Sequence, residues 1–297
     1  MSKRKQEPQL EPGDEDSSSD ISHIDVDFDF YDLNPSVDFQ ATKRLLVQLF
    51  QRDADTFNLN DLTELILAQP LGTTIKTNGS QSDPYAILTV INMHQHHEHP
   101  AIRSLVAYLL SKSSQANPTM HSALQALFCK PEPHVGLVIC ERLVNMPVQI
   151  IPPMYNILLD ELRNALNADQ PYKFSHLLLI SRTYHLSDDE ESALVNSAPT
   201  RQSEANAKSK KSKKARTVAE EYDLMKSRPD DGIYPFHPED LLITQAAECT
   251  MDYKFDKAPE GPREKDAFGL DTRGRLMLVR ADKFEELVKK MLEVYRV

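Results

Sequence analysis

The chain has 297 residues, enough for a full hydrophobic core in one or two domains, and its 40% hydrophobic content is typical of a soluble globular protein. The net charge of −11 at neutral pH favours basic partners over nucleic acid. No apolar stretch approaches the ~20 residues that a membrane span requires. The polar N-terminus shows no secretory signal.

The N-terminal segment is acidic. Residues 1–23 have too few apolar side chains to fold and are predicted to be a disordered acidic tail. From Ile24 to Phe30, apolar residues alternate with aspartates, which is the period of a strand with one acidic face. We expect this face to contact a basic partner. It consists of Asp25, Asp27 and Asp29.

Residues 38–129 show alternating helical and strand patterns. The run from Tyr85 to Met93 is nearly continuously apolar, as expected for a strand that is covered on both faces. Polar residues at helix starts predict side-chain caps at Asp38, at Asp61 with Glu64, and at Asn117. The predicted helices are 39–50, 61–69, 100–112 and 118–129, and the predicted strands are 73–77 and 85–93.

Residues 135–155 form the most distinctive segment. An apolar strand over 135–140 is followed by a polar elbow at Glu141 and Arg142. The link up to Pro152 is predicted to be extended, because each proline in it disfavours the helical region for the residue before it. A helix then begins at the double proline.

The remaining elements complete an alternation of strands and helices. The helix over 152–167 and the strand over 174–181 precede a polar stretch, 187–228, which is predicted to be a flexible basic insertion. The last elements are helices at 239–250 and 282–296 and strands at 251–255 and 275–280. This order predicts a single α/β domain, residues 24–297, with a central mixed sheet flanked by helices.

Positive charge is concentrated in the insertion. Residues 199–216 carry a net charge of +6, which leaves −17 for the rest of the chain. Interleaved serines and the absence of aromatic residues favour a nuclear-import signal over a phosphate-binding patch, and a merely solvated linker stays open. The import candidates are Lys208, Lys210, Lys211, Lys213, Lys214 and Arg216.

Signatures of enzymes and cofactor sites are missing. No two of the eight glycines are separated by a single residue, so neither a dinucleotide fingerprint nor a P-loop is present, and no GxSxG elbow occurs. The three cysteines lie far apart and are expected to be reduced thiols. We therefore expect no catalytic residue, no cofactor and no metal centre.

Two histidine-containing motifs have competing interpretations. The four histidines between His94 and His99 can bind zinc, but their position between a strand and a helix favours a solvated loop, and metal binding stays open. His237 precedes Glu239 and Asp240, which favours the start of a helix over an acid–base pair.

Five blocks of sequence, occurring in the same order, resemble the BCCIP family, whose fungal members are BCP-type nuclear proteins. The resemblance runs from about residue 26 to the C-terminus, with a gap near 190–225. The blocks are VDFDFYDLNPSVDFQATKRLLVQLF (26–50), LGTTIK (71–76), DPYAILTVIN (83–92), VGLVICERLVNMPVQIIPPMY (135–155) and YPFHPED (234–240).

This resemblance implies both a fold and a function. The implied fold is similar to the GCN-related acetyltransferases without their cofactor loop, because ERLVNMP stands where those enzymes have clustered glycines. The implied function is that of a nonenzymatic chaperone that shields a basic large-subunit ribosomal protein. It also implies support for nuclear export of a phosphatidylinositol-phosphate kinase, with shuttling by import and export receptors. An acetyltransferase with an unorthodox loop, or nucleic-acid binding through 208–216, are the alternatives.

Overall fold

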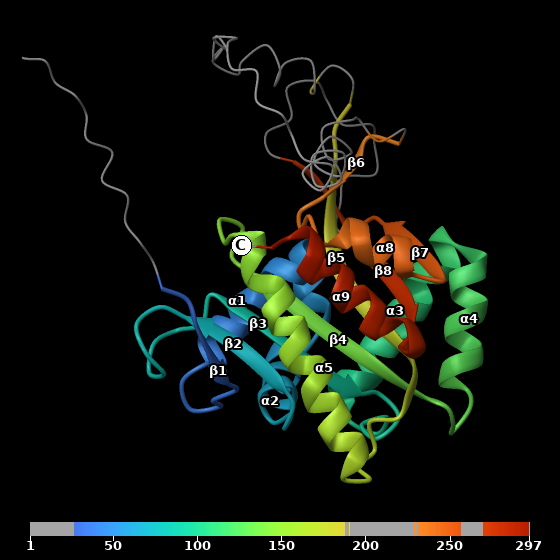
Figure 1. Cartoon of the computed structure of the whole chain (residues 1–297). Coiled ribbons are helices and arrows are strands. Elements are labelled where there is room, and N and C mark those ends of the chain that lie inside the picture. The colour runs from blue at the N-terminus through green and yellow to red at the C-terminus, as the bar shows by residue number, and fades with distance from the viewer. Residues whose placement is uncertain (1–26, 188–189, 191–228, 230, 257–269, 297) are drawn as a thin grey trace, which may run out of the picture.

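The computed structural model describes residues 27–187, 190, 229, 231–256 and 270–296, and these residues build a mixed sheet with helices on both faces (Figure 1). The strand order is β1-β2-β3-β4-β5-β8-β7, and β6 pairs with β5. The strands are β1 Asp29–Asp32, β2 Gly72–Lys76, β3 Ala86–Asn92, β4 His134–Arg142, β5 Phe174–His185, β6 Ile233–Pro235, β7 Cys249–Tyr253 and β8 Asp271–Arg280.

Helices cover the two faces of the sheet in separate groups (Figure 1). The helices are α1 Phe39–Phe50, α2 Leu59–Leu67, α3 Pro100–Ala116, α4 Pro118–Phe128, α5 Ile151–Asn167, α8 Asp240–Ala246 and α9 Phe284–Val294. One hydrophobic core contains α1 to α4, and the other contains α5, α8 and α9. No helix in the described ranges is long and apolar enough to cross a membrane.

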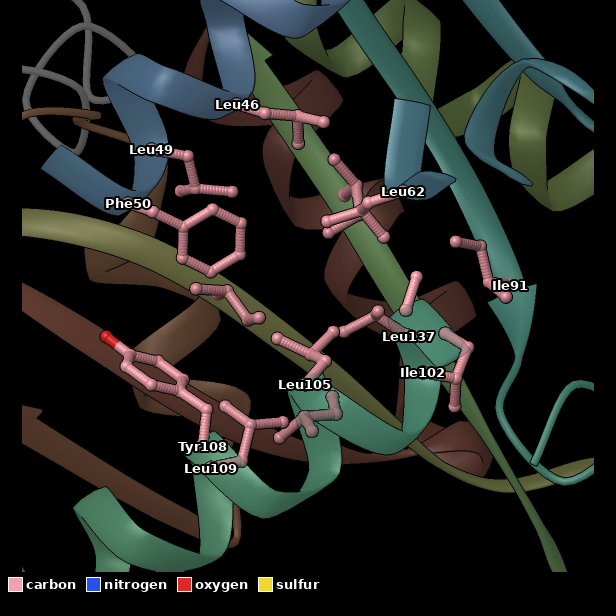
Figure 2. Close-up of a cluster of buried hydrophobic side chains, with 14 of the residues drawn as sticks. Leu46, Leu49, Phe50, Leu62, Ile91, Ile102, Leu105, Tyr108, Leu109 and Leu137 are labelled. Atoms are coloured by element: carbon pink, nitrogen blue, oxygen red, sulfur yellow. The ribbon is translucent and has the colours of Figure 1, made fainter. Parts of the chain in front are cut away.

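The first core shows how strand alternation divides the side chains. Leu137 of β4 lies near Leu105 of α3, in a cluster that also contains Leu46 and Phe50 of α1 (Figure 2). Its neighbour Val138 lies in the second core, because successive side chains of a strand point to opposite faces. The expected α/β fold, with a mixed sheet between two helical layers, is confirmed.

Two of the predicted helix caps are wrong. Asp38 makes no capping hydrogen bond to α1, because its buried carboxylate accepts instead from Lys76 Nζ at 2.6 Å. Helix α2 is capped by Asn58, which accepts from the backbone N–H of Asp61. The cap predicted at Asn117 is confirmed.

Several element boundaries also differ from expectation. The elbow predicted at Glu141 and Arg142 is wrong. Both residues belong to β4, which pairs with β3 as far as the pair Ala86–Arg142. The link after it is not extended at 148–150, where the chain forms a 3₁₀ turn. Helix α8 ends at Ala246, since the chain then pairs with β8 as β7.

The predicted N-terminal strand starts later than its pattern suggested. Its pairing begins at Asp29, opposite Lys76, which is the last residue of β2, and ends at Asp32. The predicted tail, 1–23, and nearly all of the predicted insertion, 187–228, lie outside the described residues.

Candidate functional site

The carboxyl ends of the parallel strands are the place where an α/β sheet is expected to hold a ligand. Strands β4 and β5 form the one parallel pair in the described sheet. Their register ends at the pair Val138–Leu179, after which the two strands separate. Strand β6 then pairs with β5 at Thr183–His185, on the side away from β8 and therefore toward β4. We call the space between the separated ends the crevice.

Charged side chains from both strands fill the crevice on the α1 side. Glu141 of β4 accepts two hydrogen bonds from Arg182 of β5, at 3.1 and 3.2 Å. Gln48 of α1 donates to the same carboxylate at 2.8 Å, and His237 Nε2 lies 3.2 Å from it. Glu141 and Arg182 are both buried, and the Arg182 guanidinium also covers the ring of Phe236. The four side chains therefore close this side of the crevice.

The α8 side of the crevice is closed in the same way. Arg142 of β4 makes a bidentate pair with Glu239, including a bond of 2.9 Å from Nη2 to Oε2. Ser181 of β5 donates to Asp240 at 2.5 Å. All four of these residues are buried. The segment 236–240 thus connects the two strands mainly through side-chain ion pairs and hydrogen bonds, together with one backbone bond from the Phe236 N–H to the Arg182 C=O.

The electrostatics of the crevice favour fixed charges. Burial alone would raise the pKa of Glu141, but the charges and hydrogen bonds of His237 and Arg182 outweigh it and lower this pKa to about 2. Burial lowers the pKa of His237, and the nearby Glu141 carboxylate reverses that effect and raises it. Asp240 differs, because burial and the neighbouring Glu239 raise its pKa to about 6.

The space left in the crevice is too small for a substrate. A cavity of about 10 Å³ lies between Cys140, Tyr155, His237 and Asp240. Such a volume holds about one water molecule, whereas ligand pockets usually have ~300 Å³ or more. Burial also raises the pKa of the Cys140 thiol, which keeps it protonated and weakly nucleophilic. The described crevice is therefore suited to holding strands together and unsuited to chemistry.

The residues of this network were predicted only in part. The sequence indicated Glu141, Arg142 and the His237 segment, but as an elbow and a helix start. Arg182 and Ser181 were missed. The available signal was a charged residue that directly follows an apolar strand, as in the runs VICER and LLISR.

The other candidate residues lie apart from the crevice. Lys208, Lys210, Lys211, Lys213, Lys214, Arg216 and Asp25 are outside the described residues. Asp27 and Asp29 are exposed, and only Asp29 belongs to β1. The Tyr31 hydroxyl donates to Asp29 at 3.3 Å. Whether these aspartates bind a client stays a prediction.

The histidine cluster serves local structure. The His94 ring stacks on His134 and accepts from the backbone N–H of Val135 at 3.1 Å. His99 caps α3 by accepting from the N–H of Ala101. Within the ranges that the structure describes, no three His, Cys, Asp or Glu side chains are arranged to hold a metal ion.

Comparison with known proteins identifies the family. The BCCIP family model matches residues 23–243, well over half of the chain. The chain belongs to the BCCIP family. It is 40% identical over 284 residues to "Protein bcp1" of Schizosaccharomyces pombe, a match that covers 93% of this chain and 92% of the relative. It is 38% identical to "Protein bcp1" of Aspergillus fumigatus, over 95% of this chain and 91% of that protein.

A solved structure supports the fold of this BCCIP-family chain. The crystal structure of BCP1 from Saccharomyces cerevisiae matches with a TM-score of 0.62 and 23% identity, covering 94% of this chain and 93% of the other. None of these matches supports the expected similarity to the acetyltransferase fold. The family description and the names of these relatives refer to no enzymatic activity.

Proposed function

We propose that this chain is a nonenzymatic nuclear escort of the Bcp1 type, which shields a basic large-subunit ribosomal protein during ribosome biogenesis. The observation that carries the proposal is the closed crevice: the position where this sheet would hold a ligand is filled by Glu141, Arg182 and Arg142 with their partners. Because a substrate has no room there, binding falls to the outer surface. The proposal also includes support for export of a phosphatidylinositol-phosphate kinase.

The charge distribution supports a basic client. Apart from residues 199–216, the chain carries −17. Many exposed acids are already neutralised by neighbours, as Glu285 is by Arg163 and Asp83 by Arg44. Asp27, Asp29 and Asp32 take part in none of the ion pairs within the described residues. These three carboxylates therefore project uncompensated charge, which accelerates encounter with a cationic partner.

The test is a charge-removing variant with Asp25, Asp27 and Asp29 all changed to Asn. We expect slower association with basic proteins purified from dissociated large ribosomal subunits, and a weaker salt dependence, because charge steering acts mainly on the encounter rate. Changing Asp83, Asp160 and Asp282 to Asn, which are paired with cations, is the matched control. Equal association rates for wild type and test variant at low salt would exclude this face.

Two further measurements separate the alternative functions. Calorimetry with acetyl-coenzyme A is expected to show no saturable binding, because bulky side chains follow β4 and the crevice is closed; micromolar affinity would instead favour an enzyme. Salt-dependent binding of RNA that is lost on deletion of 208–216 would favour a nucleic-acid-binding protein. We expect neither.

A further inference from the structure

Strand β1 lies at one edge of the sheet, next to β2 (Figure 1). It pairs with β2 along Asp29–Asp32, and no other strand of the described ranges pairs with it. An edge strand has a row of backbone N–H and C=O groups that another chain can bind. The outer edge of β1 is therefore a surface that can accept an additional strand.

The register shows which backbone groups point outward. Backbone groups alternate in direction along a strand, and the bond from the N–H of Met93 to the C=O of Val135 directs the odd-numbered residues of β3 toward β4. The even-numbered residues of β3 therefore bond to β2. By the register of β2 with β3, the odd-numbered residues of β2 bond to β3, and its even-numbered residues bond to β1. The partners of those even-numbered residues in β1 are Asp29 and Tyr31, which therefore bond to β2. The N–H and C=O of Phe30 consequently point away from the sheet.

The side chains at this edge present two different faces. Asp29 and Tyr31 lie on the face of α1, and the exposed Asp27 precedes them. Phe30 lies on the face of α5, with a side chain that is 38% exposed, and it is the only aromatic among the large hydrophobic residues exposed in the described ranges. A partner strand would therefore meet acids on one face and an aromatic ring on the other.

Natural proteins often protect edge strands by making them short and charged, and four residues with two aspartates fit that role. Phe30 does not fit it, because an exposed aromatic with an outward N–H promotes pairing where a proline or a charge would prevent it. The aspartates repel acidic strands and attract basic ones. Phe30 together with the aspartates therefore selects a partner strand by its charge and does not exclude all strands.

We propose that a basic client binds by adding an extended segment antiparallel to the outer edge of β1. The segment alternates Lys or Arg, opposite Asp27 and Asp29, with apolar residues opposite Phe30. Directly opposed residues of antiparallel strands share a face, so this pattern matches charge with charge and apolar with apolar surface. The inference rests on the proposed function and specifies how its client is held.

The probe is a synthetic ten-residue peptide in which lysine and valine alternate. A valine opposite Phe30 exchanges backbone bonds with it, so the valine N–H groups face β1 and the lysine N–H groups face solvent. Methylating the valine nitrogens should weaken binding to the wild-type protein at least tenfold, and methylating the lysine nitrogens should change it less than threefold. Equal effects, or the reverse order, would overturn the antiparallel arrangement.

Two substitutions of Phe30 test the same backbone contact from the side of the protein. In F30P the outward N–H is removed while the bonds of Asp29 and Tyr31 to β2 remain, as is tolerated at an edge. We expect at least tenfold weaker peptide binding in F30P and a smaller loss in F30A, which keeps the N–H. Unchanged melting would show that F30P is folded; if it is not, the methylated peptides on the wild-type protein decide the question alone.

The two proposals fail in different ways. If the wild-type protein retains none of the basic proteins from dissociated large ribosomal subunits, the proposed function is wrong. If it retains them and F30P retains them equally, while the alternating peptide does not bind, the client is held elsewhere and the strand addition is wrong.

Discussion

The crevice and the outer edge of β1 contain the same kinds of charged residue in opposite situations. In the crevice, Glu141 and Arg182 are buried and satisfy each other. At the edge, Asp27 and Asp29 are exposed and take part in no ion pair within the described ranges. Buried charges that are paired fix the arrangement of strands, whereas exposed charges without partners remain available to another molecule.

This difference also indicates that the crevice contributes to the free energy of unfolding, whereas the edge of β1 contributes to association with a partner. Removing one partner of a buried pair leaves an uncompensated charge, which costs several kcal/mol. Removing an exposed charge changes the free energy of unfolding very little, but it changes the electric field that an approaching partner experiences. The predictions below test this division, from the largest expected effect to the smallest.

The largest effect is expected from Arg182→Met. Glu141 would lose its cationic partner within the sheet and keep His237, Gln48 and the backbone N–H of Arg142, so we expect the free energy of unfolding to fall by ~3–5 kcal/mol. Denaturant titration measures it. The matched control is Arg163→Met, whose pair with Glu285 is exposed and for which we expect a loss of less than ~1 kcal/mol. Equal losses would contradict a special role for the crevice.

A pH-dependent effect is expected from Asp240→Asn. The raised pKa of Asp240, about 6, means that its contribution to stability is fully present below about pH 4 and is lost as the pH rises through 6. Asparagine imitates the neutral form. Between pH 4 and 7 the variant should therefore gain stability relative to wild type, on the order of 1–2 kcal/mol.

The control for this prediction is a carboxylate that does not titrate in the same range. Asp282 is exposed, and its hydrogen bond with Arg280 lowers its pKa below the ordinary 3.8. Its contribution to stability is therefore almost fully present at pH 4 and is lost only on further acidification, so the difference between Asp282→Asn and wild type should stay nearly constant between pH 4 and 7. Unfolding titrations at pH 4, 5, 6 and 7 measure both variants. If the difference in unfolding free energy between Asp240→Asn and wild type does not change with pH, Asp240 is charged in the folded protein throughout this range.

A smaller effect is expected at the edge of the sheet. Changing Asp27 and Asp29 together to Asn should alter the free energy of unfolding by less than ~0.5 kcal/mol, because both side chains are exposed. The same variant should still slow association with basic client proteins. A loss above 1 kcal/mol would mean that these aspartates support the fold, and the comparison with the crevice would then fail.

The smallest effect on stability is expected from deleting 208–216. The segment is too polar to contribute to a core, so the melting temperature should hardly change. In cells, the deletion should move the protein toward the cytoplasm, as fluorescence microscopy would show. Deleting an equally long stretch, 191–199, is the control. An unchanged nuclear signal would exclude the proposed import role.

Most elements could be predicted from the sequence because their patterns are local. The continuous apolar run of β3, the stripe of α5 and the capping residue Asn117 each act within a few residues. Some errors were local, such as the cap of α2 and the 3₁₀ turn at 148–150, but the errors in the crevice concern residues whose partners are remote in sequence. Glu141 lies 41 residues from Arg182, and Arg142 lies 97 residues from Glu239.

The local pattern of the sequence by itself determined the α/β class, the apolar faces of the strands and helices, and the family resemblance. Only the tertiary structure decided that Glu141 and Arg142 continue a strand, that Asp38 pairs with Lys76, and that β1 begins at Asp29. Burying a charge is unfavourable until a partner neutralises it, and here that partner arrives from a distant segment. A strand likewise extends only as far as its neighbour offers backbone groups, and neither condition is contained in a local pattern.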